Sequence, residues 1–162
     1  MRYLQGAAIL ALLVAAMFLP TGEAHASTIY KDSVQGVEIY ATSTEGVFSG
    51  TASGDLPGPW YADVHHTPLN PNGIITGGYT DVATYLGLVE GTFTGGTVTR
   101  TNPGSNCTNQ VYDVEATLGN VGVGGGSGNG SFSGTLTHLR REIFGHCVTY
   151  SATITGALAL TF

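Results

Sequence analysis

The stretch GVGGGSGNGSFSGTLTH, from Gly122 to His138, decides how this chain folds. Its first half is rich in glycine, and its second half alternates small polar residues with Phe132, Gly134, Leu136 and His138. A glycine-rich run is typical either of a flexible linker between two domains or of a turn within one β-domain. The segments before and after it each hold too few strands to be stable alone. The glycines are therefore predicted to belong to the wall of a single domain.

The same alternation continues on both sides of this stretch. From Val148 to Phe162 every second residue is apolar or glycine, which predicts one long strand or a pair of strands broken near Gly156. Further strands are predicted at 34–41, 46–53, 59–67, 74–80, 84–94, 96–101 and 112–118. Turn residues separate them at 55–59, 68–73 and 102–104.

About eight or nine short strands, with almost no helix signal, predict an all-β domain. Antiparallel strands with nothing to cover their edges favour a closed barrel or a sandwich. Glycines inside strands, as in 48–54 and 91–96, supply the bends that tight curvature needs, and so favour a single antiparallel β-barrel over residues 27–162. The residues predicted to share its core are Phe132, Leu136, Tyr150, Ile154, Leu158 and Leu160.

Residues 1–26 have the features of a secretory signal peptide. Arg2 precedes an apolar run from Ala7 to Leu19, and the small residues around His25 predict cleavage before Ser27. The apolar run is shorter than the roughly 20 residues of a membrane-spanning helix. The remaining chain is therefore expected to be secreted or periplasmic.

The charge of the chain argues against nucleic-acid binding. The net charge is −6, and removal of the signal peptide leaves it unchanged because Arg2 and Glu23 cancel. The cations that remain are Lys31, Arg100, Arg140 and Arg141. They are too few to neutralise a row of phosphates. Attraction to anionic membrane surfaces is not expected for the same reason.

Cys107 and Cys147 are the only cysteines, and both lie in the part predicted to be exported. An even cysteine count in an oxidising compartment predicts a disulfide. The bridge would close a loop of about forty residues and contribute roughly 3–4 kcal/mol to the free energy of unfolding. Redox-active or metal-binding thiols usually lie closer together in sequence, so a structural role is favoured and no metal is predicted.

The order of these segments resembles that of a known family of small barrels. A strand at 116–118 leads into the glycines at 124–128 and then into a Phe-x-Gly strand at 130–135. This succession is similar to that of bacterial secreted members of the allene-oxide-cyclase-like and dirigent-like barrels, as are 48–54 and 75–78. The resemblance implies a small barrel with an apolar interior. The aromatic residue that closely follows the family's glycine element comes later here, at Phe132, and no residue matches the polar positions of cyclising members. The resemblance therefore transfers no catalytic residue.

Two neighbouring histidines, His65 and His66, are predicted to point to opposite faces of one strand. His66 shares a face with Trp60 and Val64, whereas His65 lies on the other face. The two imidazoles therefore cannot bind one metal ion from a regular strand. A surface histidine beside a histidine at the rim of the barrel is the favoured interpretation.

His138 and His146 lie on the apolar faces of their strands. They would be cross-strand neighbours if the hairpin turn between them were centred near Glu142. Together with His66 and Tyr150 they are the predicted ligand contacts at a polar mouth of an otherwise apolar barrel. Unrelated histidines near loops are the competing interpretation.

Glu90 is the candidate for acid–base catalysis. It shares a face with Leu86 and Leu88, and inside the barrel its pKa would rise by desolvation. Thr92 and Thr94 share that face too, which suits a solvated exterior equally well. The chain holds no nucleophile elbow, zinc-binding His-Glu-x-x-His or phosphate-binding loop, and no cofactor is predicted.

Three functions remain open. The first is an exported, soluble, noncatalytic barrel that binds a small apolar ligand or serves as a structural component of the cell envelope. The second is an enzyme of the cyclase or isomerase type that acts on an apolar substrate in a dry cavity. The third is a small outer-membrane barrel, suggested by the terminal Phe162, although most predicted strands are shorter than the roughly ten residues such barrels need. The sequence indicates neither the identity of the ligand nor the oligomeric state.

Overall fold

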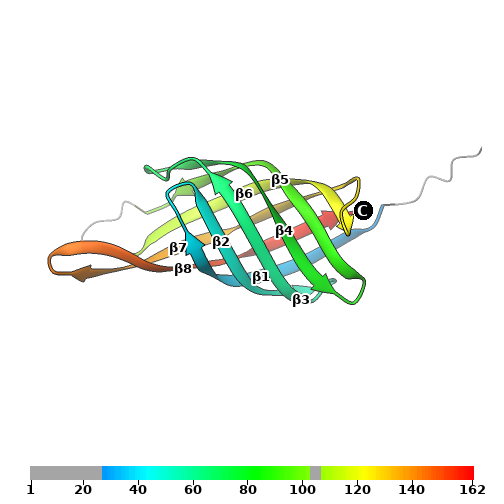
Figure 1. Ribbon diagram of the computed structural model, residues 1–162, viewed down its shortest axis with the longest axis horizontal. Helices are drawn as coiled ribbons and strands as arrows, with labels where there is room; N and C mark the ends of the chain where they lie inside the picture. The colour runs from blue at the N-terminus through cyan, green and yellow to red at the C-terminus, as the bar shows by residue number, and fades with distance from the viewer. Residues whose placement is uncertain (1–26, 103–106) are drawn as a thin grey trace, which may run out of the picture.

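The computed structural model describes residues 27–102 and 107–162. The predicted signal peptide, residues 1–26, lies outside the described residues, as do residues 103–106 in the expected turn after Asn102. The described residues form one closed antiparallel barrel in which β1 to β8 follow one another around the wall and β8 pairs with β1 (Figure 1). Its strands are β1 (Ile29–Ala41), β2 (Glu45–Gly54), β3 (Gly58–His66), β4 (Gly73–Thr84), β5 (Gly87–Arg100), β6 (Gln110–Val123), β7 (Gly128–Ile143) and β8 (His146–Thr161). This confirms the predicted all-β barrel. No helix in the described ranges is long and apolar enough to cross a lipid bilayer.

Several strands are longer than the sequence pattern predicts. The predicted strands 84–94 and 96–101 are one strand, β5, because two bulges in its pairing with β6 bend it without ending it. Residues 148–161 likewise lie in one strand, β8, which continues through Gly156. Bulges of this kind follow from the pairing register, which a single sequence does not display.

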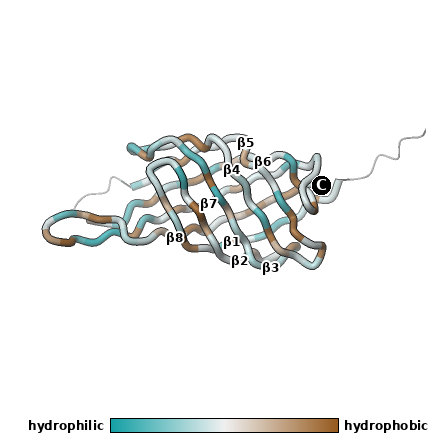
Figure 2. The backbone as a smooth tube through the Cα atoms, viewed as in Figure 1, coloured by the Kyte–Doolittle hydropathy of each residue, from teal (hydrophilic) through white to brown (hydrophobic). Residues whose placement is uncertain are grey.

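The β7–β8 hairpin extends beyond the rest of the barrel at one end (Figure 1). Its strands stay paired as far as Ile143 and His146, so the turn lies at Phe144-Gly145 and not near Glu142, the centre that would have made His138 and His146 neighbours. Both turn residues have positive φ, 51° and 78°. Apolar residues mark the tip of this hairpin (Figure 2), where Phe144 is 98% exposed.

The glycine-rich segment is the turn between β6 and β7. Gly124 and Gly125 have φ of 68° and 86°, in the left-handed region that glycine adopts without strain. The Gly124 N–H donates to the carbonyl oxygen of Leu88 at 2.8 Å, which fixes the turn to the start of β5. The segment is part of the barrel wall and not a linker.

An apolar core fills one half of the barrel. Five of the six predicted core residues are buried, and the sixth, Tyr150, is 54% exposed near the projecting hairpin. The ring of Phe132 lies against Gly134 and Gly156, a cross-strand pair on β7 and β8. A Cβ at either glycine would lie 2.6 Å from the ring, so both glycines are needed to make room for it.

The end of the barrel opposite the projecting hairpin is closed. The rings of Tyr30 and Phe162 stack there with centroids 4.9 Å apart. Leu56, in the β2–β3 turn, is fully buried, and its N–H donates to Asp32 Oδ1 at 2.9 Å. Solvent therefore reaches the interior from the hairpin end.

Candidate functional site

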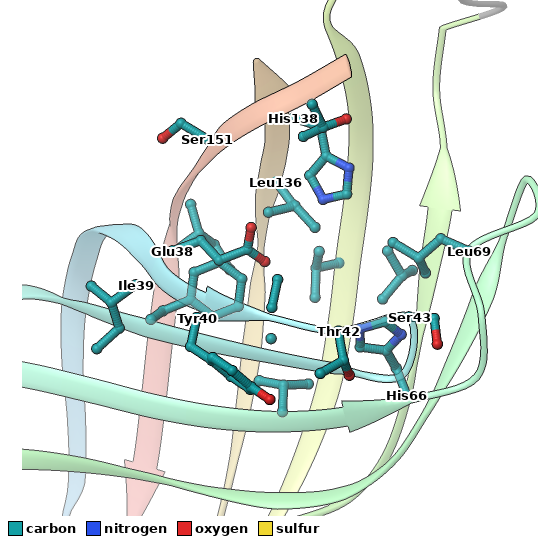
Figure 3. Close-up of a pocket in the computed structure, with 18 of the residues that line it drawn as sticks. Glu38, Ile39, Tyr40, Thr42, Ser43, His66, Leu69, Leu136, His138 and Ser151 are labelled. Carbon is teal, nitrogen blue, oxygen red and sulfur yellow. The ribbon is translucent and has the colours of Figure 1, made fainter. Parts of the chain in front are cut away.

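The hairpin end of the barrel is hollow, and holds an open cavity of about 610 Å³ (Figure 3). The pairing of β1 with β8 ends at Val37 and Thr153, and beyond this point residues 38–41 of β1 and 149–151 of β8 line the cavity. The opening therefore lies where these two strands separate. Small-molecule pockets typically measure about 300–1,000 Å³, so the cavity has the size of a ligand site.

The deep wall of the cavity is apolar. The side chains that form it come from β2, β3 and β5 to β8: Phe48, Val64, Val98, Val114, Leu136 and Ile154. Below them Trp60, Phe93 and Phe132 fill the barrel and leave a void of only about 20 Å³. The cavity thus has a solid apolar floor and occupies the open half of the barrel.

Polar side chains surround the mouth above this floor. They are Glu38, Thr42, Ser43, His66 and His138, all labelled in Figure 3, where the hydroxyl of Ser151 points away from the cavity. A few polar groups above an apolar wall are the usual means by which a pocket orients a largely apolar ligand. His66, His138 and Tyr150, three of the four predicted contact residues, line this cavity.

The two cavity histidines are held in different ways. His66 Nδ1 lies 2.8 Å from the carbonyl oxygen of Thr67, which can only accept, so this nitrogen carries the proton and Nε2 is the free acceptor of the neutral ring. The ring of His138 packs against that of Tyr112, with centroids 5.2 Å apart. Burial and the neighbouring His66 and Arg140 lower the pKa of His138, which favours its neutral form.

Glu38 is a cavity residue that the sequence analysis missed. It is half-buried on the inner face of β1, and burial raises the pKa of its carboxyl above 4.5. The signal was present in the sequence, because Val34, Gly36 and Glu38 share one face of the strand. Since Val34 is a core residue, Glu38 must also face inward.

His146 does not lie with the other predicted contact residues. It is exposed and pairs with Ile143 beside the hairpin turn, whereas His138 pairs with Ala152. The two imidazoles are therefore not cross-strand neighbours. The reason is the length of the hairpin, which carries His146 beyond the mouth of the barrel.

Glu90 lies on the outer face of β5. Its neighbour Val89 and the nearby Phe93 are buried, and Leu88, which shares the face of Glu90, is exposed. Glu90 pairs with Asp81 of β4 on the outside of the barrel. The leucines mark the outer face of this strand, so Glu90 is not placed to act in the cavity.

A second polar cluster lies on the inner wall of β5, β6 and β7 at the cavity end: Arg100, Gln110, Tyr112 and Arg140. With its amide oriented to suit its neighbours, Gln110 accepts at Oε1 from Nη2 of Arg100 and Nη1 of Arg140, both at 3.2 Å, and donates from Nε2 to the Tyr112 hydroxyl at 3.1 Å. Burial raises the pKa of Tyr112, and the positive charges of the two arginines oppose that rise. From the sequence alone, these arginines count only toward the net charge.

A group of possible metal ligands lies on the outer surface. Glu45, Asp63 and His65 bring one ligand atom each within 4.8 Å of one another. His65 Nε2 is 3.4 Å from Asp63 Oδ1, an attraction that accounts for their proximity when the imidazole is protonated. His65 thus lies outside while His66 lines the cavity, as strand alternation predicts.

The predicted disulfide between Cys107 and Cys147 is present, with Cα atoms 5.2 Å apart. It joins the connection between β5 and β6 to the start of β8, two residues before the part of β8 that lines the cavity. The projecting hairpin is therefore fixed to a second point of the barrel beside the mouth.

No protein-family model matches the chain, and comparison with curated proteins and with solved structures finds no significant match. The chemistry of the cavity is the basis on which its role can be argued.

Proposed function

We propose that this protein is an exported, noncatalytic barrel that binds a small, largely apolar molecule in the cavity at its hairpin end. The observation that carries the proposal is the hollow half of the barrel. A barrel of this size has just enough interior for its own side chains or for one small ligand. Here the side chains fill only the half that holds Trp60, Phe93 and Phe132.

The distribution of polar residues supports a barrel that remains in water. The outward positions of β7 and β8 are mostly Ser and Thr, and those of β6 include Asp113 and Glu115. Most of the large apolar residues that are exposed lie at or next to turns. Barrels that span the outer membrane have the reverse pattern, an apolar band outside and a polar interior. The shortness of the predicted strands does not distinguish a barrel in water from an outer-membrane barrel, since the strands are longer than predicted and β8 has 16 residues.

The disulfide supports export, because such bonds persist in oxidising compartments. The predicted signal peptide points in the same direction. The resemblance to allene-oxide-cyclase-like and dirigent-like barrels stays a prediction and adds no residue to the site.

Titration of the mature chain with the neutral dye Nile red tests the proposal. We expect saturable binding, and a loss of at least about tenfold in affinity in Leu136→Trp, whose larger ring would occupy the cavity. Val98→Phe is a second filling variant, in case the first does not fold. Thr135→Trp, on the outer face of the same strand as Leu136, is the matched control. Absence of saturable binding, or equal affinities in the filling and control variants, would contradict the proposal.

A cyclase- or isomerase-type enzyme is the second candidate, and one observation favours it. Glu38 is a half-buried carboxyl of raised pKa in a cavity that also holds His66 and His138, and such groups suit proton transfer. The test is incubation with extracted lipids, followed by mass spectrometry for a product that forms with the native chain but not with Glu38→Gln. If native and variant protein give the same spectrum, the noncatalytic function stands.

A further inference from the structure

We propose that the ligand is an anionic amphiphile, whose apolar tail occupies the cavity and whose head group is bound by Arg100 and Arg140. This inference rests on the proposed function and names the chemical class of the ligand. The observation that carries it is that the positively charged guanidinium groups of Arg100 and Arg140 lie close together beside the cavity, with no carboxylate of the described residues paired to them.

The two guanidinium groups share a single acceptor. Both lie 3.2 Å from the side-chain oxygen of Gln110, which is uncharged and cannot offset their mutual repulsion. Both arginines are partly buried on the inner wall, where repulsion is screened less than at the surface. Residues 27–162 carry only four cationic side chains besides histidine. Two of these four lie together at Gln110.

No carboxylate among the described residues forms an ion pair with either arginine. The Nε of Arg100 is buried and has no hydrogen-bond partner within the same part of the chain. Each guanidinium has five N–H donors, and one shared amide oxygen satisfies few of them. An anion with two or three oxygens, such as a carboxylate, sulfonate or phosphate, would supply the missing charge and acceptors.

The position of the pair relative to the cavity decides what the rest of the ligand must be. Arg100 lies two residues beyond Val98 on β5, and Arg140 two residues beyond His138 on β7. Val98 and His138 both line the cavity. Two residues of a strand span about 7 Å, so a head group at the arginines would lie next to the cavity wall. Its tail would then reach the apolar floor at Phe48, Val114 and Ile154.

The other titratable groups at the mouth do not replace the arginines as the anion-binding charge. The lowered pKa of His138 favours a neutral ring. The raised pKa of Glu38 makes its uncharged form more accessible, which reduces its repulsion of an incoming anion. The Nδ1–H of His66 already donates to the carbonyl oxygen of Thr67, so this proton is not available to an anionic head group.

The experiment compares ligands that differ only in the head group. Dodecanoate, dodecanol and dodecylammonium, each below its micellar concentration, are titrated against the mature chain loaded with Nile red, and acetate serves as the control without a tail. We expect dodecanoate to displace the dye at roughly tenfold lower concentration than dodecanol, and dodecylammonium and acetate to displace it poorly.

Arg100→Gln and Arg140→Gln should each weaken dodecanoate binding by roughly tenfold and leave dodecanol binding unchanged. Lys31→Gln removes the same charge from an exposed residue at the closed end and is the matched control. The comparison of head groups on the native chain keeps the test valid if an arginine variant does not fold.

Equal displacement by dodecanoate and dodecanol, or equal effects of the arginine and Lys31 variants, would overturn the inference and leave apolar binding intact. Failure of Nile red, dodecanol and dodecanoate to bind would instead overturn the proposed function, and the inference with it.

Discussion

Trp60 Nε1 donates a hydrogen bond to Thr80 Oγ1 at 2.8 Å inside the barrel, directly below the cavity. The Thr80 hydroxyl donates in turn to the carbonyl oxygen of Tyr61, also at 2.8 Å. Both side chains are almost fully buried, so neither can exchange its partner for water. The only tryptophan of the chain is thereby held in one position under the cavity floor, and its fluorescence reports on the fold.

Thr80→Val should lower the free energy of unfolding by roughly 1–3 kcal/mol, because it removes the acceptor and leaves the buried Trp60 N–H without a partner. Urea denaturation followed by Trp60 emission measures the loss. Thr80→Ser keeps the hydroxyl and is the control. If the serine and valine variants unfold at the same urea concentration, the hydrogen bond does not contribute as argued.

Removal of the disulfide should destabilise the barrel strongly. The bridge joins residues 40 apart in sequence, and the chain-entropy model assigns a loop of that length roughly 4 kcal/mol. The double variant Cys107→Ser/Cys147→Ser, unfolded in urea beside the oxidised native chain, measures the difference. Thiol labelling of the exported native chain should find no free cysteine, and detection of two free thiols would contradict a disulfide in the mature protein.

The barrel and its core could be predicted because they depend on the short-range alternation of the strands, and the disulfide because the chain holds only two cysteines. Alternation alone identifies Phe132, Leu136 and Ile154 as core residues, and an even number of cysteines in a segment predicted to be exported predicts their pairing. The face of Glu38 was predictable by the same rule, by counting from Val34. Strand ends were less predictable, since bulges and hairpin length are set by pairing between strands.

The cluster of Arg100, Gln110 and Arg140 could not be predicted, because it joins residues from three strands. Gln110 meets Arg100 and Arg140 only through the register of β5 with β6 and of β6 with β7. A shift of one residue in either pairing would place at least one of the three on the outside. For Glu90, the nearby leucines were compatible with an inner face. The residue that faces inward is the smaller Val89, so its neighbour Glu90 lies on the outer face with Leu88.

Glu38→Gln should stabilise the barrel at neutral pH. The carboxyl has a raised pKa in the folded chain because burial disfavours its charge. Its contribution to stability is therefore fully present below its unfolded pKa of about 4.5 and is lost as the pH rises through the higher folded value. We expect the variant to exceed the native chain in free energy of unfolding at pH 7 and to equal it near pH 4. Glu115→Gln, on the outer face of β6, is the control, and a lower stability of Glu38→Gln at pH 7 would contradict the argument.

The stability of the barrel should fall as the pH drops below 6.5, and His138 should account for part of that fall. Desolvation, His66 and Arg140 lower its pKa in the folded chain, so the unfolded chain takes up a proton first. The loss begins at the unfolded pKa of about 6.5 and levels off below the folded value. Tyr112, whose pKa is raised by burial, stays neutral across this range, while Glu38, whose pKa is also raised, affects stability with the opposite sign. Urea denaturation at pH 7.5 and 5.5 should show a smaller difference in His138→Gln than in the native chain. The exposed His146→Gln, on the projecting hairpin, is the matched control, and an identical pH dependence of native and His138→Gln protein would refute the role assigned to the cavity histidine.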